Sequence, residues 1–424
     1  MTELLEPLRD LTSSQIRYKR DKHRFIVLPA GRRSRKTLIS KRKVLYAALR
    51  NKGHRYFHGA PTRQQAKQIF WKDLKTYTKY FRRSVNETEL FVTLLNGSEI
   101  HVVGLDKPER IEGQPWNGCH ITEIGNVKDT AWPENIRPLL SDTNGFALLD
   151  GVPEGRNHYY KLALYAAGGA LPETRPEVGA FAANPDDREW VYYSWFSADV
   201  LPAAEIEAAK RQLDEKTYRQ EYEGSFESFQ GLAYYPYGNH NLKMCEYDKD
   251  RVVSVGMDFN VDPMTATLGH IISDTYYQFG EVYLNNSNTF EMRDHLLERF
   301  SPKQVIIYPD STGKHESSNA TESDLAILRK AGFAIRARNN PRVKDRVNAV
   351  NSLLKSFKGS TRYYINPNTC PKTINDFNMV ERTDDGRLNK KQEEQGLKHI
   401  TDALGYLINY NWPVSERGAF TVER

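Results

Sequence analysis

The chain contains few cysteines and no long apolar run. Cys119, Cys245 and Cys370 are its three cysteines among 424 residues, and their scattered positions fit neither a zinc site nor a disulfide framework. No apolar stretch is long enough to span a bilayer, and the opening segment MTELLEPLRDL does not have the pattern of a secretory signal. We therefore expect reduced thiols in a cytosolic protein that makes no membrane contact.

The composition is that of a soluble globular protein. Hydrophobic residues make up 39% of the chain and charged residues 27%, and the 24 tyrosines argue against disorder. A chain of 424 residues is too long for one ordinary hydrophobic core, so we expect two domains.

The net charge of +6 is distributed unevenly. Residues 1–50 contain 14 Lys and Arg against 4 Asp and Glu, a balance of +10, which leaves −4 for the remainder. Such a segment is either a solvated face or a surface that contacts phosphates. We favour the second interpretation because a candidate phosphate-binding loop lies within it.

Three separated aspartates stand out in the C-terminal part of the chain. Asp258 in VVSVGMDFNVDP and Asp310 in KQVIIYPDSTG each end an apolar, β-branched run, whereas Asp402 in LKHITDALGYLINY lies on an amphipathic helix. Carboxylates that converge from distant segments onto two Mg²⁺ or Mn²⁺ ions are typical of a ribonuclease-H-like nuclease. The order of elements, three strands followed by alternating helices and strands, favours the same fold.

A candidate phosphate loop lies near the N-terminus. The strand FIVLP precedes residues 30–37, and a helical pattern follows them. A phosphate loop needs a Lys on the β- and γ-oxygens and a hydroxyl on Mg²⁺, which are roles that suit Lys36 and Thr37. The strict pattern, however, requires glycine where Ala30 and Arg35 stand. The loop alone therefore leaves nucleotide binding open.

Neighbouring segments fit a nucleotide-binding domain. Gln15 and Arg17 lie where an adenine-reading segment is expected, and WNGCHITEIGNV is expected to be a strand that ends at Glu123. In this fold class a strand-end Glu polarises the attacking water, and the preceding residue is usually an acid. Here that residue is Thr122.

With these motifs the chain resembles the large terminase subunit of tailed bacteriophages over roughly residues 10–410. The loop of residues 30–37 resembles the family pattern Gly-Gly-Arg-x-Ser-Gly-Lys-Ser/Thr, and GVPEGRNHY at 151–159 resembles G-x-P-x-G-x-N-H-[FY]. The segments APTRQQAK at 60–67 and RQEYEGSF at 219–226 match as well.

The resemblance implies an α/β protein with an N-terminal P-loop (RecA/ASCE-like) ATPase domain at 1–229, a linker at 230–250 and a C-terminal RNase H-like endonuclease domain at 251–424. Glu123 is the implied base for ATP hydrolysis, Thr37 holds the Mg²⁺ of ATP, and the three aspartates hold two Mg²⁺ or Mn²⁺ ions. The implied ATP contacts are Gln15, Arg17, Ala30, Gly31, Arg32, Arg33, Ser34, Arg35, Lys36, Thr37 and Asn157.

It also implies an activity and partners. A large terminase drives double-stranded DNA into a procapsid with ATP and cuts concatemeric DNA. It works as a ring of copies on a portal protein, with a small terminase subunit, in the host cytoplasm and outside the mature virion. Two alternatives stay open: a DNA-binding scaffold, or a repair ATPase-nuclease, with a degenerate ATPase site.

Several further expectations concern details of the second half. Asp262 and Glu281 are either accessory metal ligands or solvated acids. His399 lies one turn before Asp402 and so on the same side of the helix, where it is either a core histidine or a group that supports the metal ligands. We also expect a surface loop at 168–190 and one continuous helix within 198–228. Basic residues near the aspartates are candidates for contact with the DNA backbone: Lys314, Arg336, Arg338, Arg342, Lys344, Arg346, Lys390, Lys391 and Lys398.

Overall fold

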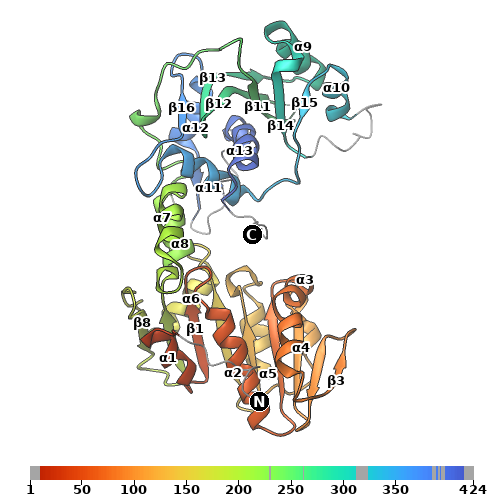
Figure 1. Cartoon of the computed structure of the whole chain (residues 1–424), viewed down its shortest axis with the longest axis vertical. Coiled ribbons are helices and arrows are strands. Elements are labelled where there is room, and N and C mark those ends of the chain that lie inside the picture. Colours follow the sequence, from red (N-terminus) through yellow and green to blue (C-terminus); the bar gives the residue numbers. More distant parts are fainter. Residues whose placement is uncertain are drawn as a thin grey trace. The chain divides into compact units, whose positions relative to one another are not determined.

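The computed structural model describes residues 10–228, 231–260, 262–311, 323–383, 388–389, 392 and 397–414. They belong to two compact units (Figure 1). The first comprises Met1–Ile206 with Arg219–Ser228, and the second comprises Glu207–Tyr218 with Phe229–Arg424. Within the described ranges, no helix has the length and apolar character needed to cross a membrane.

The first unit is built on a nine-stranded sheet in the order β3-β4-β5-β2-β6-β7-β1-β9-β8. The six strands from β5 to β9 in this order are parallel, and β4 and β8 join the two ends of that parallel set in antiparallel fashion. The strands are β1 (Phe25–Pro29), β2 (Arg55–Ala60), β3 (Arg82–Asn86), β4 (Phe91–Leu94), β5 (Glu99–Gly104), β6 (Gly118–Ile121), β7 (Phe146–Gly151), β8 (Ala180–Ala183) and β9 (Trp190–Ser194).

Helices cover both faces of this sheet because its strands are buried on both sides. On β1, Ile26 and Leu28 pack in one cluster with Ile39 of α2, whereas Phe25 and Val27 pack in another with residues of α6. The helical segments are α1 (Ser13–Arg20), α2 (Lys36–Arg50), α3 (Arg63–Ala66), η1 (Lys67–Trp71), α4 (Lys72–Thr78), η2 (Pro108–Ile111), η3 (Ile124–Asn126), η4 (Ala131–Ile136), α5 (Arg137–Leu139), α6 (His158–Ala166) and η5 (Ser197–Asp199). Helices α7 (Ala203–Gln212) and α8 (Glu215–Glu223) follow, and residues of both are divided between the two units.

Two expectations about the segment after β7 are wrong. The predicted loop at 168–190 contains strand β8, which pairs with β9. The predicted single helix within 198–228 is two helices, because Asp214 interrupts it. The Asp214 carboxylate accepts a hydrogen bond from the backbone N–H of Thr217 at 3.1 Å, which caps a new helix start.

The second unit contains a six-stranded sheet in the order β15-β14-β11-β12-β13-β16. Strands β11, β12 and β13 form an antiparallel meander, and β14 runs parallel to β11. The strands of this unit are β10 (Gly231–Leu232), β11 (Val253–Asp258), β12 (Met264–Ile272), β13 (Thr275–Leu284), β14 (Val305–Pro309), β15 (Ala334–Ile335), β16 (Tyr363–Ile365) and β17 (Glu381–Arg382), of which β10 and β17 pair separately.

Alternation along β11 decides which face carries the candidate site. Val253, Val255 and Met257 pack in one apolar cluster with residues of α9, so the intervening Ser254, Gly256 and Asp258 lie on the opposite face. Helix α13 packs against this opposite face, and a Cβ on Gly256 would collide with the carbonyl oxygen of Ala403. The absence of a side chain at Gly256 therefore lets α13 approach the strand that carries Asp258.

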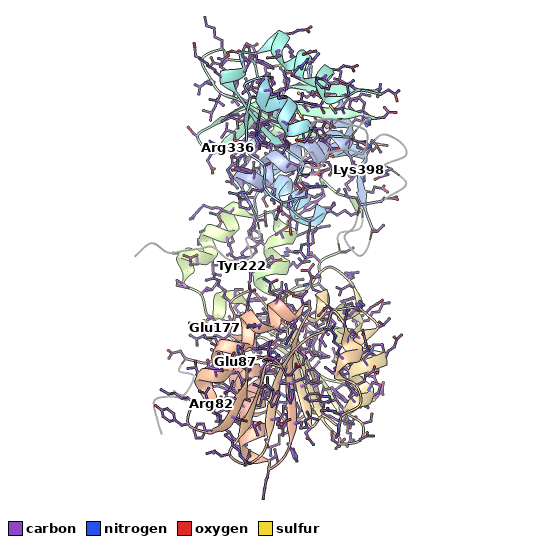
Figure 2. All side chains as sticks on the ribbon, turned by 90° about the vertical axis from the view of Figure 1, so that its right-hand side faces the viewer. Arg82, Glu87, Glu177, Tyr222, Arg336 and Lys398 are labelled. Carbon is purple, nitrogen blue, oxygen red and sulfur yellow. The ribbon has the colours of Figure 1, made fainter. Side chains whose placement is uncertain are left out.

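Beyond residue 230, the described part of the second unit contains five longer helices and two short helical turns. Side chains of both units are drawn in Figure 2, where Lys398 marks the residue that precedes α13. These segments are η6 (Asn239–Asn241), α9 (Thr289–Arg299), η7 (Pro302–Gln304), α10 (Asp324–Lys330), α11 (Val343–Leu354), α12 (Pro371–Met379) and α13 (His399–Asn411).

Candidate functional site

The loop between β1 and α2 is fixed at its start by backbone hydrogen bonds. The N–H of Ala30 donates to Gly151 at 3.2 Å, that of Gly31 to Trp195 at 3.1 Å, and that of Arg32 to Glu221 at 2.7 Å. Gly31 has no room for a side chain, because a Cβ there would collide with Ser197 and with the carbonyl oxygen of Tyr222.

The segment after α8 therefore forms part of this loop's surroundings. Tyr222 is labelled in Figure 2, and Gly224 just beyond it comes so close that a Cβ would lie 2.8 Å from Cα of Ala30. The Glu221 carboxylate forms an ion pair with Arg32. Residues 219–226 therefore have a structural role: they hold the start of the loop in place.

Arg35 occupies a position that favours glycine. Its φ of 65° and ψ of 6° place it in the left-handed region, directly before the first residue of α2. Arg33 also has a positive φ, of 57°. The family pattern has glycine at the position of Arg35, and this conformation is the physical reason.

Lys36 lies at the loop's helical end and is 6% exposed. Its ammonium donates to the carbonyl oxygen of Gly31 at 3.1 Å, so the side chain reaches back across the loop. Burial lowers the pKa of Lys36, while the negative charges of Glu123 and Asp150 raise it in part. The lysine is thus a desolvated cation that faces the carboxylates of two strand ends.

Asp150 at the end of β7 was not among the predicted site residues. Its Oδ1 accepts a hydrogen bond from Thr122 Oγ1 at 2.6 Å and lies 3.5 Å from Thr37 Oγ1, and its Oδ2 pairs with His120 at 2.7 Å. Burial would raise its pKa, but the charge of His120 and these hydrogen bonds hold the pKa of Asp150 below its ordinary value. A buried carboxylate therefore lies beside the hydroxyl predicted to hold Mg²⁺.

Glu123 follows the end of β6 by two residues, with a positive φ of 54°. Burial raises the pKa of Glu123, while Lys36 and Arg32 lower it in part. A carboxylate with a raised pKa is a better proton acceptor than an ordinary one. The structure thus brings Glu123 into electrostatic range of Lys36, as the predicted role requires.

Asn157 and His158 fix the segment that follows Glu123. Asn157 caps α6 and donates to the carbonyl oxygen of Gly125 at 2.9 Å, while His158 is bonded to the carbonyl oxygen of Ile124 at 2.9 Å. The hydrogen bonds of Asn157 therefore go to backbone groups of these loops, so the structure gives it a positioning role.

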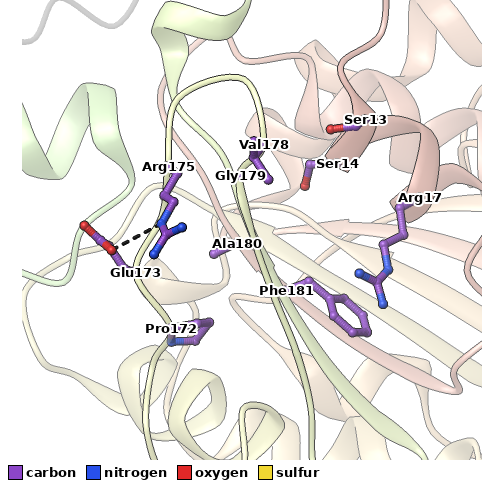
Figure 3. A pocket seen from close by; sticks show the side chains of 10 residues that line it. All are labelled: Ser13, Ser14, Arg17, Pro172, Glu173, Arg175, Val178, Gly179, Ala180 and Phe181. Carbon is purple, nitrogen blue, oxygen red and sulfur yellow. Dashed lines mark hydrogen bonds and ion pairs between the residues drawn. The ribbon is translucent and has the colours of Figure 1, made fainter.

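Gln15 and Arg17 separate on helix α1. The amide of Gln15 donates to the carbonyl oxygen of Ser34 at 3.1 Å, which places it against the loop. The guanidinium of Arg17 instead lies 3.3 Å from the ring centre of Phe181 and lines a pocket of about 470 Å³ together with residues of 172–181 (Figure 3). Gln15 is thus a loop contact, whereas Arg17 faces a different pocket.

In the second unit, the strand ends bring two predicted carboxylates together. Met257 is paired with Pro309 across parallel strands β11 and β14, so Asp258 and Asp310 follow at the same edge of the sheet. The backbone N–H of Asp310 donates to the carbonyl oxygen of Met257 at 3.1 Å. Both side chains are largely buried, with 8% exposure for Asp258 and 7% for Asp310.

Helix α13 adds the third carboxylate. Burial raises the pKa of Asp402 to about 6, and the nearby charge of Asp258 adds to this, while Arg346 lowers it. Burial likewise raises the pKa of Tyr406, and the charges of Asp258, Asp310 and Asp402 all contribute in the same direction. All three carboxylates therefore lie within electrostatic range of one partly buried phenol.

His399 and Arg346 provide positive or hydrogen-bonding partners to this cluster. His399 Nδ1 lies 3.7 Å from Asp258 and 3.1 Å from the amide of Asn260, and its bond to Asp258 raises its pKa. Arg346 of α11 donates to Asp402 at 2.8 Å. His399 therefore lies beside Asp258, which fits the second of the two roles considered for it, a group that supports a metal ligand.

The donor chemistry of the three aspartates suits a hard divalent cation. Each of these carboxylates is largely removed from solvent, where uncompensated negative charge is costly and a cation relieves the cost. Among the residues that the structure describes, however, no group of three or more His, Cys, Asp or Glu is already arranged to hold a metal ion. The side chains fit the ion by type, and Arg346 accounts for part of their charge without it.

The remaining acidic candidates have structural partners. The Glu281 carboxylate accepts from the backbone N–H groups of Lys372 and Thr373, at 2.7 and 2.9 Å, and so caps α12. Asp262 accepts from the N–H of Asn286 at 3.1 Å. These bonds favour a structural role over metal binding for both.

The basic residues expected near the site differ in their surroundings. Arg346 is 6% exposed, so it is unlike an ordinary surface cation. Arg342 pairs with Asp345 at 3.0 Å, and Arg338 lies 4.3 Å from the ring centre of Tyr410. Lys314, Lys390 and Lys391 lie outside the described residues.

Comparison with known proteins bears on both units. The family model "Terminase RNaseH-like domain" matches residues 255–411. The large terminase subunit of Thermus virus P23-45 is 29% identical over 174 residues, and that of Escherichia phage T5 is 24% identical over 307 residues, or 68% of this chain. The resemblance to large terminase subunits is confirmed. The aligned segments span 35% of the Thermus virus protein and 66% of the phage T5 protein.

Solved structures establish the fold of the whole chain. The large terminase of the thermophilic bacteriophage D6E superposes with a TM-score of 0.66 at 16% identity, over 94% of this chain and 98% of that one. Its complex with ATP-gamma-S superposes with a TM-score of 0.64 over the same shares. The predicted fold class is thus confirmed: a P-loop ATPase fold followed by an RNase H-like fold.

Two residues of these sites, Asp150 and Tyr406, escaped the sequence analysis, and Arg346 was expected there only as a contact for the DNA backbone. Asp150 lies on an apolar strand directly before the segment 151–159, and its position at a parallel strand end was the available signal. Tyr406 follows Asp402 by four residues on α13, so helical spacing was the signal for it. Arg346 carries no motif and comes to Asp402 through the packing of α11 on α13.

Proposed function

We propose that this protein is an ATP-driven motor that moves double-stranded DNA into a procapsid and an endonuclease that cuts it from a concatemer. The observation that carries the proposal is the presence of two sites on one chain with a terminase fold. One is a lysine-bearing loop with carboxylates at adjacent strand ends, and the other is a buried set of three aspartates.

In the first site, Lys36 would bind the β- and γ-phosphate oxygens, and the backbone of the loop would surround the phosphates. Thr37 would hold the Mg²⁺ of ATP, with Asp150 beside it in the place of the acid that Thr122 does not supply. Glu123 would accept the proton of the attacking water, because burial leaves its carboxylate more basic than usual.

In the second site, Asp258, Asp310 and Asp402 would hold two divalent ions. Bound there, such ions lower the pKa of an attacking water and neutralise charge on the phosphate. His399 would keep Asp258 oriented through its Nδ1. The packing of α13 over Gly256 would exclude water from the inner side of the cluster.

We propose the partners from the same resemblance. The protein would act as a ring of copies docked on a portal protein, and a small terminase subunit would bring it DNA in the host cytoplasm. A DNA-binding scaffold or a repair ATPase-nuclease is the competing proposal, and the left-handed Arg35 in the phosphate loop is the feature that favours a weakened ATPase.

The test uses the purified full chain with two single variants. Lys36→Ala should lose nucleotide affinity and packaging while it still nicks plasmid with Mn²⁺. Asp310→Ala should lose cleavage while it still binds ATP. Equal cleavage by Asp310→Ala and the wild type would contradict the nuclease site, and unchanged nucleotide binding by Lys36→Ala would contradict the phosphate site. If the wild type itself neither binds nucleotide nor cuts plasmid, the scaffold is favoured.

A further inference from the structure

Arg346 lies among the three candidate metal-binding carboxylates. Its guanidinium donates to Asp402 at 2.8 Å and stands 4.4 Å from the ring centre of Tyr406. The side chain is 6% exposed, and its Nε is buried with no hydrogen-bond partner among the described residues. One donor of a fork-shaped group is therefore used, and a neighbouring donor in the same plane is not.

A ligand that accepts a hydrogen bond from the unused donor would relieve the cost of its burial. A buried N–H without a partner costs roughly 1–3 kcal/mol, and arginine remains charged at every relevant pH. A guanidinium presents two parallel N–H groups that match the oxygens of one phosphate. Nε together with an Nη group of Arg346 is such a pair.

The same guanidinium competes with a cation for Asp402. It occupies one oxygen of that carboxylate, and its charge would repel a divalent ion bound by Asp258 and Asp402. This explains why the carboxylates are close enough to act on Tyr406 together and yet are not arranged to hold a metal as they stand. Loosening of the Arg346–Asp402 pair would therefore favour metal binding.

We propose that Arg346 is a resident counter-cation of the carboxylate cluster, and that it releases Asp402 to the metal when its guanidinium binds a phosphate of the DNA backbone. This inference rests on the proposed nuclease function. It makes Arg346 a positioning residue that acts through Asp402. It also predicts that metal and DNA each raise the affinity of the protein for the other, because binding couplings are reciprocal.

The experiment measures Mn²⁺ binding by electron paramagnetic resonance, without nucleotide, in the absence and presence of a short DNA duplex. Samples are kept cold, and a gel verifies that the duplex stays intact. For the wild type we expect weak binding alone and binding about tenfold tighter with DNA. Arg346→Met should bind Mn²⁺ about tenfold more tightly than the wild type without DNA, because the competing charge is gone. DNA should then add clearly less in the variant.

Arg362→Met is the matched control. Arg362 also pairs with an aspartate, Asp274 at 2.9 Å, in the same unit, but none of its contacts involves the cluster. Its Mn²⁺ affinity and DNA coupling should equal those of the wild type. Arg346→Lys is a second test variant, because it keeps the positive charge and loses the two parallel N–H donors. Without DNA it should bind Mn²⁺ as weakly as the wild type, and DNA should raise its Mn²⁺ affinity by less.

The outcomes separate the inference from the function on which it rests. Equal Mn²⁺ affinity and equal coupling in the wild type and Arg346→Met would overturn the role of Arg346 while the metal site stands. If Arg346→Met does not fold, full coupling in Arg346→Lys would overturn it instead. Asp310→Ala should weaken Mn²⁺ binding in the wild type and in the Arg346 variants. If it leaves Mn²⁺ binding unchanged in all of them, the proposed metal site itself is overturned.

Discussion

The hydroxyl of Thr122 donates a hydrogen bond of 2.6 Å to Oδ1 of Asp150, at the end of the neighbouring strand. Thr122 is the position where the sequence lacks an expected acid, and the structure supplies one from β7 at the same place in space. The same oxygen lies 3.5 Å from Thr37 Oγ1. A carboxylate is therefore present at the predicted Mg²⁺ position, although it belongs to a different strand.

Asp150→Asn should impair ATP turnover more than nucleotide binding. The change keeps the size of the side chain and removes its charge, and loss of a group that supports a metal ion typically costs about 10- to 100-fold in activity. We expect a decrease of that size in the steady-state ATPase rate. Affinity for ATP measured without divalent ions should stay within about twofold, because Lys36 and the loop remain.

Thr122→Val is the control for Asp150→Asn. It removes the hydrogen bond to Asp150 and keeps the carboxylate, so we expect a loss of less than about tenfold. An Asp150→Asn protein with the turnover of the wild type would contradict a role for this carboxylate in ATP hydrolysis.

Arg35→Gly should stabilise the first unit and tighten nucleotide binding. Arg35 has a φ of 65°, a conformation that costs a non-glycine residue about 1 kcal/mol, of which the added flexibility of glycine in the unfolded chain returns a part. We expect the free energy of unfolding to rise by about 0.5 kcal/mol and ATP to bind more tightly. Arg50→Gly, at the regular end of α2, should instead destabilise the protein. A less stable Arg35→Gly protein would show that the side chain of Arg35 contributes more than its backbone costs.

Much of both folds can be predicted from patterns along single segments. The apolar strand β1, the helix after it and the meander that begins at β11 have clear periodicities, and Asp258 and Asp310 are identified by their places at strand ends. Neighbouring parallel strands bring such ends together, so local patterns suffice for this part of the site.

The remaining features depend on contacts between segments that are distant in sequence. Asp214 divides a segment with continuous helical periodicity, because its carboxylate caps the second helix and also accepts a hydrogen bond from Tyr235. Strand β8 exists through its pairing with β9. Arg346 resembles a surface cation in the sequence, and only the packing of α11 against α13 buries it beside Asp402. Sequence periodicity does not contain this information.

Gly256→Ala should separate α13 from the sheet. A Cβ at Gly256 would collide with the carbonyl oxygen of Ala403, and it would also lie 2.9 Å from the hydroxyl of Thr267. The backbone of α13 would have to move to relieve this collision, so we expect the free energy of unfolding to fall by about 1–3 kcal/mol. The cleavage rate should fall by more than the loss of folded protein explains, because Asp402 lies on the displaced helix.

Gly280→Ala provides a matched control in the same sheet. The nearest atom to a Cβ there is 3.5 Å away, on Leu268, which is an ordinary contact distance. This variant should cut plasmid with Mn²⁺ as the wild type does and lose little stability. Equal cleavage by the two variants would mean that the close approach of α13 does not set the position of Asp402.

Asp376→Asn should change how the stability of α12 depends on pH. Burial raises the pKa of Asp376 to about 7, from an ordinary value of 3.8, while its hydrogen bond with Thr401 opposes the shift. The fold therefore favours the protonated carboxyl. Its contribution is fully present below about pH 4 and is lost as the pH rises through about 7. The shift corresponds to a loss on the order of 2–4 kcal/mol across that window.

Hydrogen exchange of the peptide that contains Pro371–Met379 measures this effect in the full chain. In the wild type, the opening free energy of this peptide should fall between about pH 4 and pH 7, once intrinsic exchange is corrected. Asp376→Asn stays neutral and should remove most of that decline. Asp294→Asn, which alters an exposed carboxylate paired with Arg293, should retain the wild-type profile. If the decline persists unchanged in Asp376→Asn, another group in the second unit takes up the proton.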